Sequence, residues 1–418
     1  MRSAAIAGLL AAAIGAAPPA PVTIHFLMWK PQQREVWGRV FAEFETQNPG
    51  LRIAAEEAPA SAGDFHAALV TKLRARDPTL DAFLIDIVWP AELAAAGWLE
   101  PLDDLLDRDR FVPAAVQAAT VGGRAVSVPF DVDCGVLYYR KDLLEELGLR
   151  PPETWDDLAR QADAIRARHP DVVGFTAPFD RYEGLVCTLL EFVASNGGRF
   201  ERDGKVALDA RAEEAVAWVR DRLLDRIAPR AVLNQREPES REVFIQGRAA
   251  FHRNWPETWR IANDPAQSQV AGRVGLAPLP RFEGGRSAST LGGWQLAIAS
   301  TSPRKDGARR LVRFLSGFQA QKQLTLGTGQ LSARMEVLDD PDVLAAFPHF
   351  APLKEILRTA QARPQLPDYA AFSDRLQRTL YAAIAGSGGE LGPLPAVLAM
   401  GVLLGLALLL ARGGSRAG

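Results

Sequence analysis

The sequence has few of the residues on which metal and redox centres depend. It contains two cysteines, Cys134 and Cys187, and five scattered histidines, with no CxxC and no HExxH. We therefore expect no metal site. In an oxidising compartment the two cysteines could form a disulfide, or they could stay two separately buried thiols, and the sequence leaves both open.

An excess of basic charge is also missing. The chain has 48 Lys and Arg against 50 Asp and Glu, a formal net charge of −2, and no long basic run. A nucleic-acid partner therefore has no electrostatic support.

The short motifs of common enzyme classes are absent as well. There is no P-loop, no GxSxG elbow and no GxGxxG after an expected strand. Carboxylates are plentiful, so a glycosidase-like pair stays open, because spacing along the chain says little about distance in space. We expect no catalytic residues, no cofactor and no enzyme activity.

The two ends of the chain carry long apolar runs. Residues 1–21 combine one arginine, an apolar stretch and small residues, which is typical of a secretory signal. Residues 391–411 carry no charge and would span about 30 Å as a helix, the thickness of a bilayer core. We expect a linker at 386–390, a transmembrane helix at 391–411 and a cytoplasmic tail at 412–418, since arginines follow the apolar run. A buried apolar helix is the alternative at each end.

Between these ends, strand and helix patterns alternate. Apolar β-rich runs at 22–29, 51–57 and 81–89 are separated by helical spacing, which predicts a parallel, doubly wound α/β sheet. Residues 154–169 predict a helix with Thr154 and Asp157 as its cap, and residues 307–324 predict another.

Tryptophans stand beside polar residues or glycines in expected loops. The stretch "FHRNWPETW" (251–259) holds two, in surroundings that are a poor set for burial, and "LGGW" (291–294) holds a third. A flat ring beside hydrogen-bonding groups suits a sugar, whose C–H face packs on the ring while its hydroxyls meet the polar groups. The alternative is that each tryptophan belongs to the core.

Five blocks carry a family resemblance: "DIVWPAELAAAGWLEPLDD" (86–104), "VPFDVDCGVLYYRKDLLEELGL" (128–149), "YEGLVCTLLEFVASNGG" (182–198), "FIQGRAAFHRNWPETW" (244–259) and "LGGWQLAIA" (291–299). In this order they resemble the extracellular solute-binding proteins of carbohydrate ABC transporters (family 1), and most of all the trehalose/maltose-binding branch. The resemblance implies a periplasmic-binding-protein-like α/β fold (type II), with two lobes, a ligand cleft and a hinge. We expect lobe one at 22–128 with 275–325, and lobe two at 129–274 with 326–385.

The resemblance also implies which residues meet the ligand. Trp255 and Trp294 would stack on sugar rings near Gly292, Asp86 and Asp133 would accept sugar hydroxyls, and Arg363 would donate to the sugar. After the first strand relatives often present a glutamate, for which the register offers Gln33 or Glu35. At His66 and Asp131 relatives often carry other residues, and Glu183 is expected to shape the cleft.

The resulting hypothesis is an exported receptor in the periplasm or outside the cell, anchored in the cytoplasmic membrane by its C-terminal helix. It would capture an α-glucoside disaccharide such as trehalose or maltose and deliver it to the permease subunits of an ABC importer. Three alternatives stay open: a membrane-anchored sugar sensor, a receptor for a non-sugar solute such as a glycerophosphodiester, and a carbohydrate-active enzyme.

Overall fold

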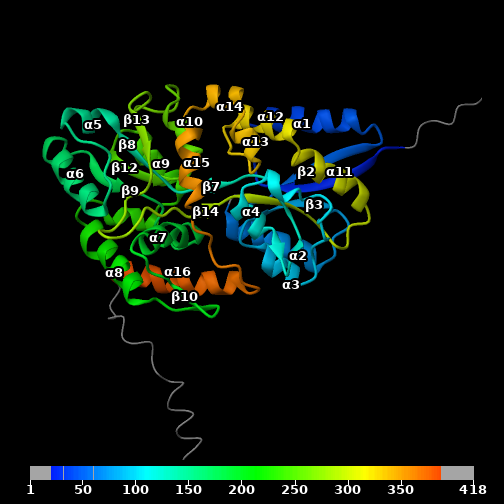
Figure 1. Ribbon diagram of the computed structural model, residues 1–418, viewed down its shortest axis with the longest axis horizontal. Helices are drawn as coiled ribbons and strands as arrows, with labels where there is room; N and C mark the ends of the chain where they lie inside the picture. The colour runs from blue at the N-terminus through cyan, green and yellow to red at the C-terminus, as the bar shows by residue number, and fades with distance from the viewer. Residues whose placement is uncertain (1–19, 32, 60, 387–418) are drawn as a thin grey trace, which may run out of the picture.

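The computed structural model describes residues 20–31, 33–59 and 61–386, and it contains two main sheets (Figure 1). The five-stranded sheet has the order β2-β1-β3-β15-β6, and the four-stranded sheet has the order β13-β8-β12-β9. The five-stranded sheet consists of β2 (Leu51–Glu57), β1 (Val22–Met28), β3 (Ala82–Asp86), β15 (Trp294–Ile298) and β6 (Val128–Pro129). The four-stranded sheet consists of β13 (Val274–Ala277), β8 (Val136–Arg140), β12 (Ala249–Asn254) and β9 (Val173–Thr176).

Short strands complete the β-structure. They are β4 (Thr120–Val121), β5 (Arg124–Ala125), β7 (Asp133–Cys134), β10 (Glu201–Arg202), β11 (Lys205–Val206) and β14 (Leu291–Gly292).

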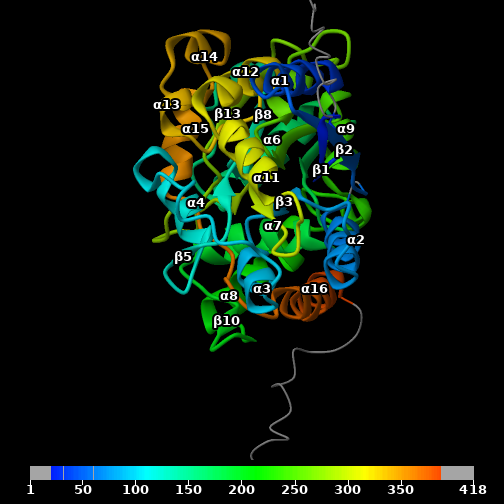
Figure 2. The same ribbon diagram turned by 90° about the vertical axis from the view of Figure 1, so that its right-hand side faces the viewer.

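Helices cover both sheets. Figure 2 shows α1 and α12 above the strands of the five-stranded sheet and α2 and α3 below them. On the other side of the molecule, α16 packs along α7 and α8 (Figure 1). The helices are α1 (Arg34–Gln47), α2 (Ala62–Arg74), α3 (Pro90–Ala95), α4 (Pro113–Ala118), α5 (Lys141–Glu146), α6 (Trp155–Arg168), α7 (Glu183–Ser195), α8 (Ala210–Trp218), α9 (Glu237–Ile245), α10 (Thr258–Ala262), α11 (Lys305–Leu315), α12 (Phe318–Thr328), α13 (Met335–Leu338), α14 (Pro341–Ala346), α15 (Phe350–Arg358) and α16 (Tyr369–Ala385).

The predicted parallel arrangement holds for the first three strands and ends there. β1 pairs in parallel with both β2 and β3, as the β-α-β-α-β pattern predicts. β15 runs antiparallel to β3 and to β6, so the far side of the same sheet is antiparallel. Burial explains the apolar runs, since β3 is buried along its whole length.

Three segments cross between the two sheets beside one another. The first crossing contains β7 and the second contains β14, and these two short strands pair antiparallel. The third crossing, beyond α15, joins this group through a bridge between Thr290 and Gln361. β13 belongs to the four-stranded sheet and β15 to the five-stranded sheet. If the lobes follow the sheets, the second crossing therefore falls after residue 277 and not at 275; the lobe limits themselves stay a prediction.

One predicted helix cap is observed, whereas two other predicted elements differ in extent from the observed ones. The capping box of Thr154 and Asp157 at the start of α6 is confirmed. The strand expected at 81–89 ends at Asp86, and a turn leads directly into α3. The single helix expected at 307–324 is two helices, α11 and α12, because the chain leaves helical geometry at residues 316–317.

The two cysteines are free, and both are buried. Of the two alternatives that the sequence left open, the structure has the separately buried thiols.

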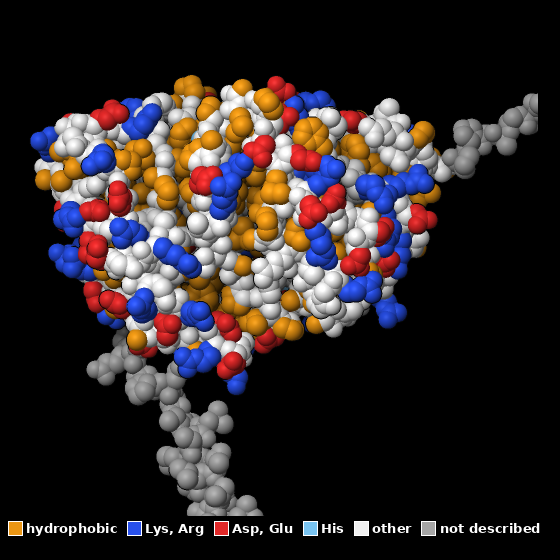
Figure 3. Space-filling model, viewed as in Figure 1, with side chains coloured by type: hydrophobic (Ala, Val, Ile, Leu, Met, Phe, Trp, Pro, Cys, Tyr) orange, Lys and Arg blue, Asp and Glu red, His pale blue; other side chains and the backbone are white. Residues whose placement is uncertain are grey.

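No helix within residues 20–386 as described is both long and apolar enough to cross a bilayer. The span predicted at 391–411, the tail at 412–418 and nearly all of the predicted signal lie outside the described residues. Figure 3 shows basic and acidic side chains interspersed over the face in view, as the balanced composition predicts.

Candidate functional site

Strand ends bring aromatic and acidic side chains into the space between the two sheets. β3 ends at Asp86, and Trp294, the first residue of β15, lies directly opposite Asp86 in the register. From the other sheet, Trp255 follows the last residue of β12. Ligands of open α/β sheets bind beyond the carboxyl ends of the strands, where Asp86 and Trp255 lie. Trp294 reaches the same edge of the sheet because β15 runs antiparallel to β3.

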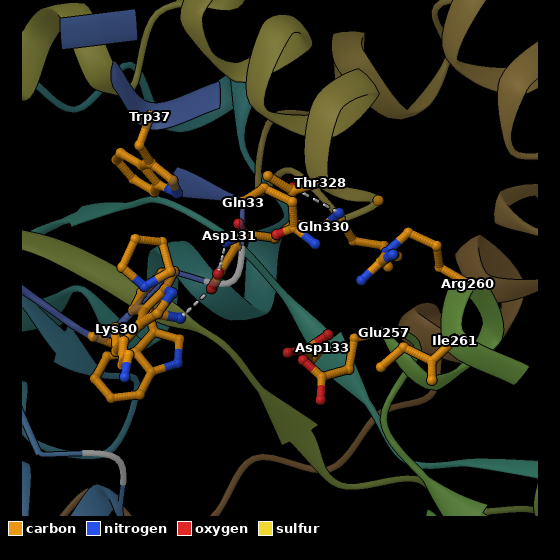
Figure 4. Close-up of a pocket in the computed structure, with 15 residues that line it drawn as sticks. Lys30, Gln33, Trp37, Asp131, Asp133, Glu257, Arg260, Ile261, Thr328 and Gln330 are labelled. Carbon is orange, nitrogen blue, oxygen red and sulfur yellow. Dashed lines mark hydrogen bonds between the residues drawn. The ribbon is translucent and has the colours of Figure 1, made fainter. Parts of the chain in front are cut away.

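Two adjoining cavities occupy this place. The first has a volume of about 300 Å³ and the second about 510 Å³, and both are lined by Asp133, Glu257 and Trp294. Figure 4 shows the first cavity, with Gln33, Asp131 and Gln330 grouped on one side and Arg260 and Ile261 on another. Volumes of this order fit a small organic ligand, for which pockets of roughly 300–1,000 Å³ are usual.

Most of the predicted site residues line one of these cavities. The second cavity holds Asp86, Asp133, Glu183, Trp255, Gly292, Trp294 and Arg363. The first cavity adds Gln33 and Asp131. Whether each of them touches a ligand stays a prediction.

Glu35 and His66 line neither cavity. Glu35 is exposed in the first turn of α1. The Nε2 atom of His66 lies 3.2 Å from a carboxylate oxygen of Glu92, and its ring packs edge-on against Trp89. Neither residue is therefore brought to the place that the resemblance implied.

Arg363 joins the acidic side chains of the second cavity. Its buried guanidinium donates from one nitrogen to Glu183 at 2.7 Å and from another to Asp86 at 3.1 Å. Glu183 also accepts hydrogen bonds from the hydroxyls of Tyr369 and Ser373. Burial raises the pKa of Asp86, and the charge of Arg363 opposes that rise. The second cavity thus presents a fixed set of donors and acceptors.

Two aspartates lie close together along the chain at this place: Asp131 lines the first cavity, and Asp133 lines both. Asp131 is 4% exposed and accepts hydrogen bonds from the Trp294 backbone and from Gln330. Burial raises its pKa to about 8. Burial, and then the charge of Asp131, also raises the pKa of Asp133 well above its usual range. Among the described residues, Asp133 has no hydrogen-bond partner for its carboxylate, so it is available to a ligand.

Trp255 is half-buried and held from several sides. Its backbone carbonyl accepts a hydrogen bond of 2.9 Å from Tyr138, and its indole N–H donates to Glu237 at 3.3 Å. A Cβ on Gly292 would lie 3.2 Å from the Trp255 ring and 3.3 Å from the Asp133 side chain. Glycine at 292 therefore lets the ring approach the β14 backbone closely.

Trp294 belongs to a cluster of rings. It stacks on Phe65 with centroids 5.3 Å apart, and it also contacts Trp29 at 5.1 Å and Trp89 at 5.6 Å. Phe65 therefore occupies part of the surface of the ring, and the half-exposed remainder lines both cavities.

The stretch 251–254 corrects the expectation of an exposed polar turn. These residues end β12, and all of them are fully buried. His252 has a ring nitrogen 3.1 Å from the Thr176 carbonyl, and burial lowers its pKa to about 3. Arg253 pairs with Glu191 through both ends of its guanidinium. Buried hydrogen-bond partners thus allow these polar side chains to lie in the core, and the turn begins only at residue 256.

The sequence did not single out several residues that line the first cavity. Trp37 lies on the buried side of α1, at 3% exposure, and also lines this cavity. Gln330 follows Gly329, whose left-handed backbone ends α12, so the helix-ending glycine was the available signal. Trp29, Lys30, Arg260 and Thr328 gave no signal in the sequence.

No metal centre accompanies the cavities in the part of the chain that the structure describes. Within it, no group of three or more His, Cys, Asp or Glu side chains could hold a metal ion.

Comparisons with known proteins agree on one family. The model of the bacterial extracellular solute-binding proteins matches residues 30–322. A probable ABC transporter-binding protein of Deinococcus radiodurans is 33% identical over 403 residues, covering 92% of this chain and 94% of its own. The maltotriose-binding protein of Pyrococcus abyssi is 26% identical, over 75% of this chain and 67% of its own.

Solved structures give the same result. A maltose-bound MalE3 of T. maritima superposes with a TM-score of 0.82 at 35% identity, covering 88% of this chain and 95% of that one. The sugar-binding protein MalE of Xanthomonas citri superposes with a TM-score of 0.71 at 25% identity, over 88% and 93% of the two chains. These relatives are binding proteins, which confirms the predictions of a periplasmic-binding-protein-like fold and of a protein that is not an enzyme. The chain belongs to the family of bacterial extracellular solute-binding proteins.

Proposed function

We propose that this protein captures a sugar outside the cytoplasm and delivers it to an ABC importer, and that the sugar is an α-glucoside disaccharide such as trehalose or maltose. The second cavity carries the proposal, because it combines two half-buried tryptophans with Asp86, Asp133 and Arg363. The relatives that bind maltose and maltotriose support the choice of sugar.

Each wall of the cavity would have a separate task. The rings of Trp255 and Trp294 would pack on the C–H faces of the two sugar rings. Asp86 and Asp133 would accept hydrogen bonds from sugar hydroxyls, while Arg363 would donate to sugar oxygens. Because its partner Asp86 belongs to β3 and its partner Glu183 belongs to α7, Arg363 would also fix the distance between these two elements.

Delivery would depend on closure about the three crossing segments. Hinge closure around a ligand is the common transition of two-lobed binding proteins, and the permease would recognise the closed form. The side-by-side arrangement of β7, β14 and the segment around Gln361 supports a hinge at this place.

The membrane tether is a separate part of the proposal, and the uncharged run at 391–411 supports it. Truncation after residue 385 should release the protein from the membrane fraction into the soluble fraction of the same compartment. A full-length protein that is already soluble without detergent would contradict the tether and leave the sugar proposal intact.

Isothermal titration of the purified full-length protein against trehalose, maltose, sucrose and glycerophosphocholine tests the ligand. We expect saturable binding of one α-glucoside disaccharide and no release of glucose on prolonged incubation. Binding of glycerophosphocholine alone would overturn the sugar assignment.

A further inference from the structure

A buried charge lies directly behind one of the two tryptophans. Arg253 is fully buried in the central strand β12, and Glu191 on α7 is 1% exposed. The Arg253 Nε atom donates to Glu191 at 2.6 Å, and the second nitrogen of the fork donates to the other carboxylate oxygen. A guanidinium is expensive to bury, so this arrangement calls for a function beyond packing.

The guanidinium of Arg253 covers one face of the Trp255 ring. Its central carbon lies 4.3 Å from the ring centroid, within the range of a cation–π contact. The remaining terminal nitrogen of Arg253 is buried and has no hydrogen-bond partner among the described residues. Trp255 lines the second cavity, whereas Arg253 does not, so the guanidinium stands behind the ring and leaves the cavity side free.

The ion pair is also fixed to two of the crossing segments. Glu191 accepts a hydrogen bond of 3.1 Å from the Thr290 backbone, next to β14. Gly135, which follows β7, passes so close that a Cβ there would lie 1.9 Å from a Glu191 oxygen and 2.5 Å from an Arg253 nitrogen. The pair is therefore wedged between Trp255 and the segments that cross between the sheets.

From these contacts we infer that Arg253 is a positioning residue for ligand binding. Held by Glu191, it sets the plane of the Trp255 ring and presents the opposite face to the ligand, without touching the ligand itself. The inference rests on the proposed sugar site for its binding readout, and it has a second readout that needs no ligand.

The test removes the charges together, so that no single charge stays buried alone. In the double variant Arg253→Met with Glu191→Gln, called the neutral-pair variant, the glutamine can still accept a hydrogen bond from the Thr290 N–H. We expect disaccharide affinity to fall about tenfold, the scale of a desolvated cation–π contact. The matched control is Arg334→Met, which removes a buried arginine that lies 5.2 Å over Phe111 and lines neither cavity. Its affinity should equal that of the wild type.

A purely structural effect is separated by repeating the change in a Trp255→Ala background. In that background the neutral-pair substitutions should lower the affinity less than about twofold, because the Trp255 ring through which Arg253 acts is absent. An equal loss in both backgrounds, or unchanged affinity of the folded variant, would overturn the inference. If the neutral-pair variant does not fold, Arg253→Lys replaces it, because lysine keeps the positive charge but lacks the guanidinium fork. We expect an intermediate loss of affinity in Arg253→Lys. Wild-type affinity in that variant would also count against the inference.

The ligand-free readout is the near-ultraviolet circular dichroism of Trp255, taken as the difference between each protein and its Trp255→Phe derivative. We expect this difference spectrum to change in the neutral-pair variant and to stay unchanged in Arg334→Met. A neutral-pair variant whose difference spectrum equals that of the wild type would refute the positioning role, even if the protein bound no sugar at all.

Discussion

The buried carboxyl group of Asp131, in the wall of the first cavity, should make the folded protein less stable as pH rises. Asp131 is buried, and its pKa is raised to about 8, whereas an aspartate in an unfolded chain titrates near about 3.9. Between these values the folded protein keeps a proton that the unfolded chain has lost. Stability from this group therefore falls by about 1.4 kcal/mol per pH unit, or about 4 kcal/mol between pH 5 and pH 8.

The substitution Asp131→Asn should remove this dependence. Asparagine has the shape of a neutral carboxyl group, its oxygen can still accept the Trp294 N–H, and Gln330 can turn its amide to match. Urea unfolding of wild type and variant at pH 5, 6.5 and 8 measures the effect. The stability of the variant relative to wild type should increase steadily with pH.

Asp77→Asn serves as the control with the opposite sign. Hydrogen bonds from the Thr79 hydroxyl and backbone lower the pKa of Asp77 to about 2. Its contribution is therefore fully present above the unfolded pKa of about 3.9, and it is lost only as pH falls toward about 2. The Asp77 variant should show a constant difference from wild type between pH 5 and pH 8. The same constant difference for Asp131→Asn would refute the view that burial keeps Asp131 protonated.

Four further substitutions test the site and its surroundings. Trp255→Ala should weaken disaccharide binding at least about tenfold with little loss of stability. Trp294→Ala should weaken binding and also lower the free energy of unfolding in urea by about 3 kcal/mol, because that ring packs against three others. Equal stability of the two variants would contradict the role of the ring cluster. Arg363→Met should lower stability by about 3 kcal/mol, since it leaves two carboxylates without their cation, and a variant as stable as wild type would show that the pairs contribute little. Gly293→Ala should destabilise the second crossing, because Gly293 has φ +131° and a Cβ there would lie 2.4 Å from the Asp131 carbonyl; melting at the wild-type temperature would exclude that strain.

Local patterns predicted the elements whose causes are local. The individual strands and helices of the β-α-β-α-β run at the start, and the cap formed by Thr154 and Asp157, depend on residues within a few positions of each other, and all are present. The break between α11 and α12 was missed because apolar spacing continues across residues 316–317. A gap of two residues hardly disturbs a helical period, so periodicity alone cannot report it.

The site was predicted mainly through the family resemblance, and physical pairing explains what was missed. Arg253 was interpreted as exposed because its partner, Glu191, is 62 positions away in the sequence. The ring cluster around Trp294 draws Trp29, Phe65 and Trp89 from separate elements, and no spacing along the chain indicates such a group. Both features depend on tertiary contacts, which override local composition.

The pairing of β15 with β3 has a consequence for how the chain reaches its folded state. Residue 294 lies opposite residue 86, so the five-stranded sheet lacks an inner strand until most of the polypeptide has been made. Contacts over such separations are slow to form, because a long loop must close before the pairing stabilises it. During synthesis the apolar edge of β3 is therefore uncovered until β15 has been made, and an uncovered edge of this kind can pair with another chain.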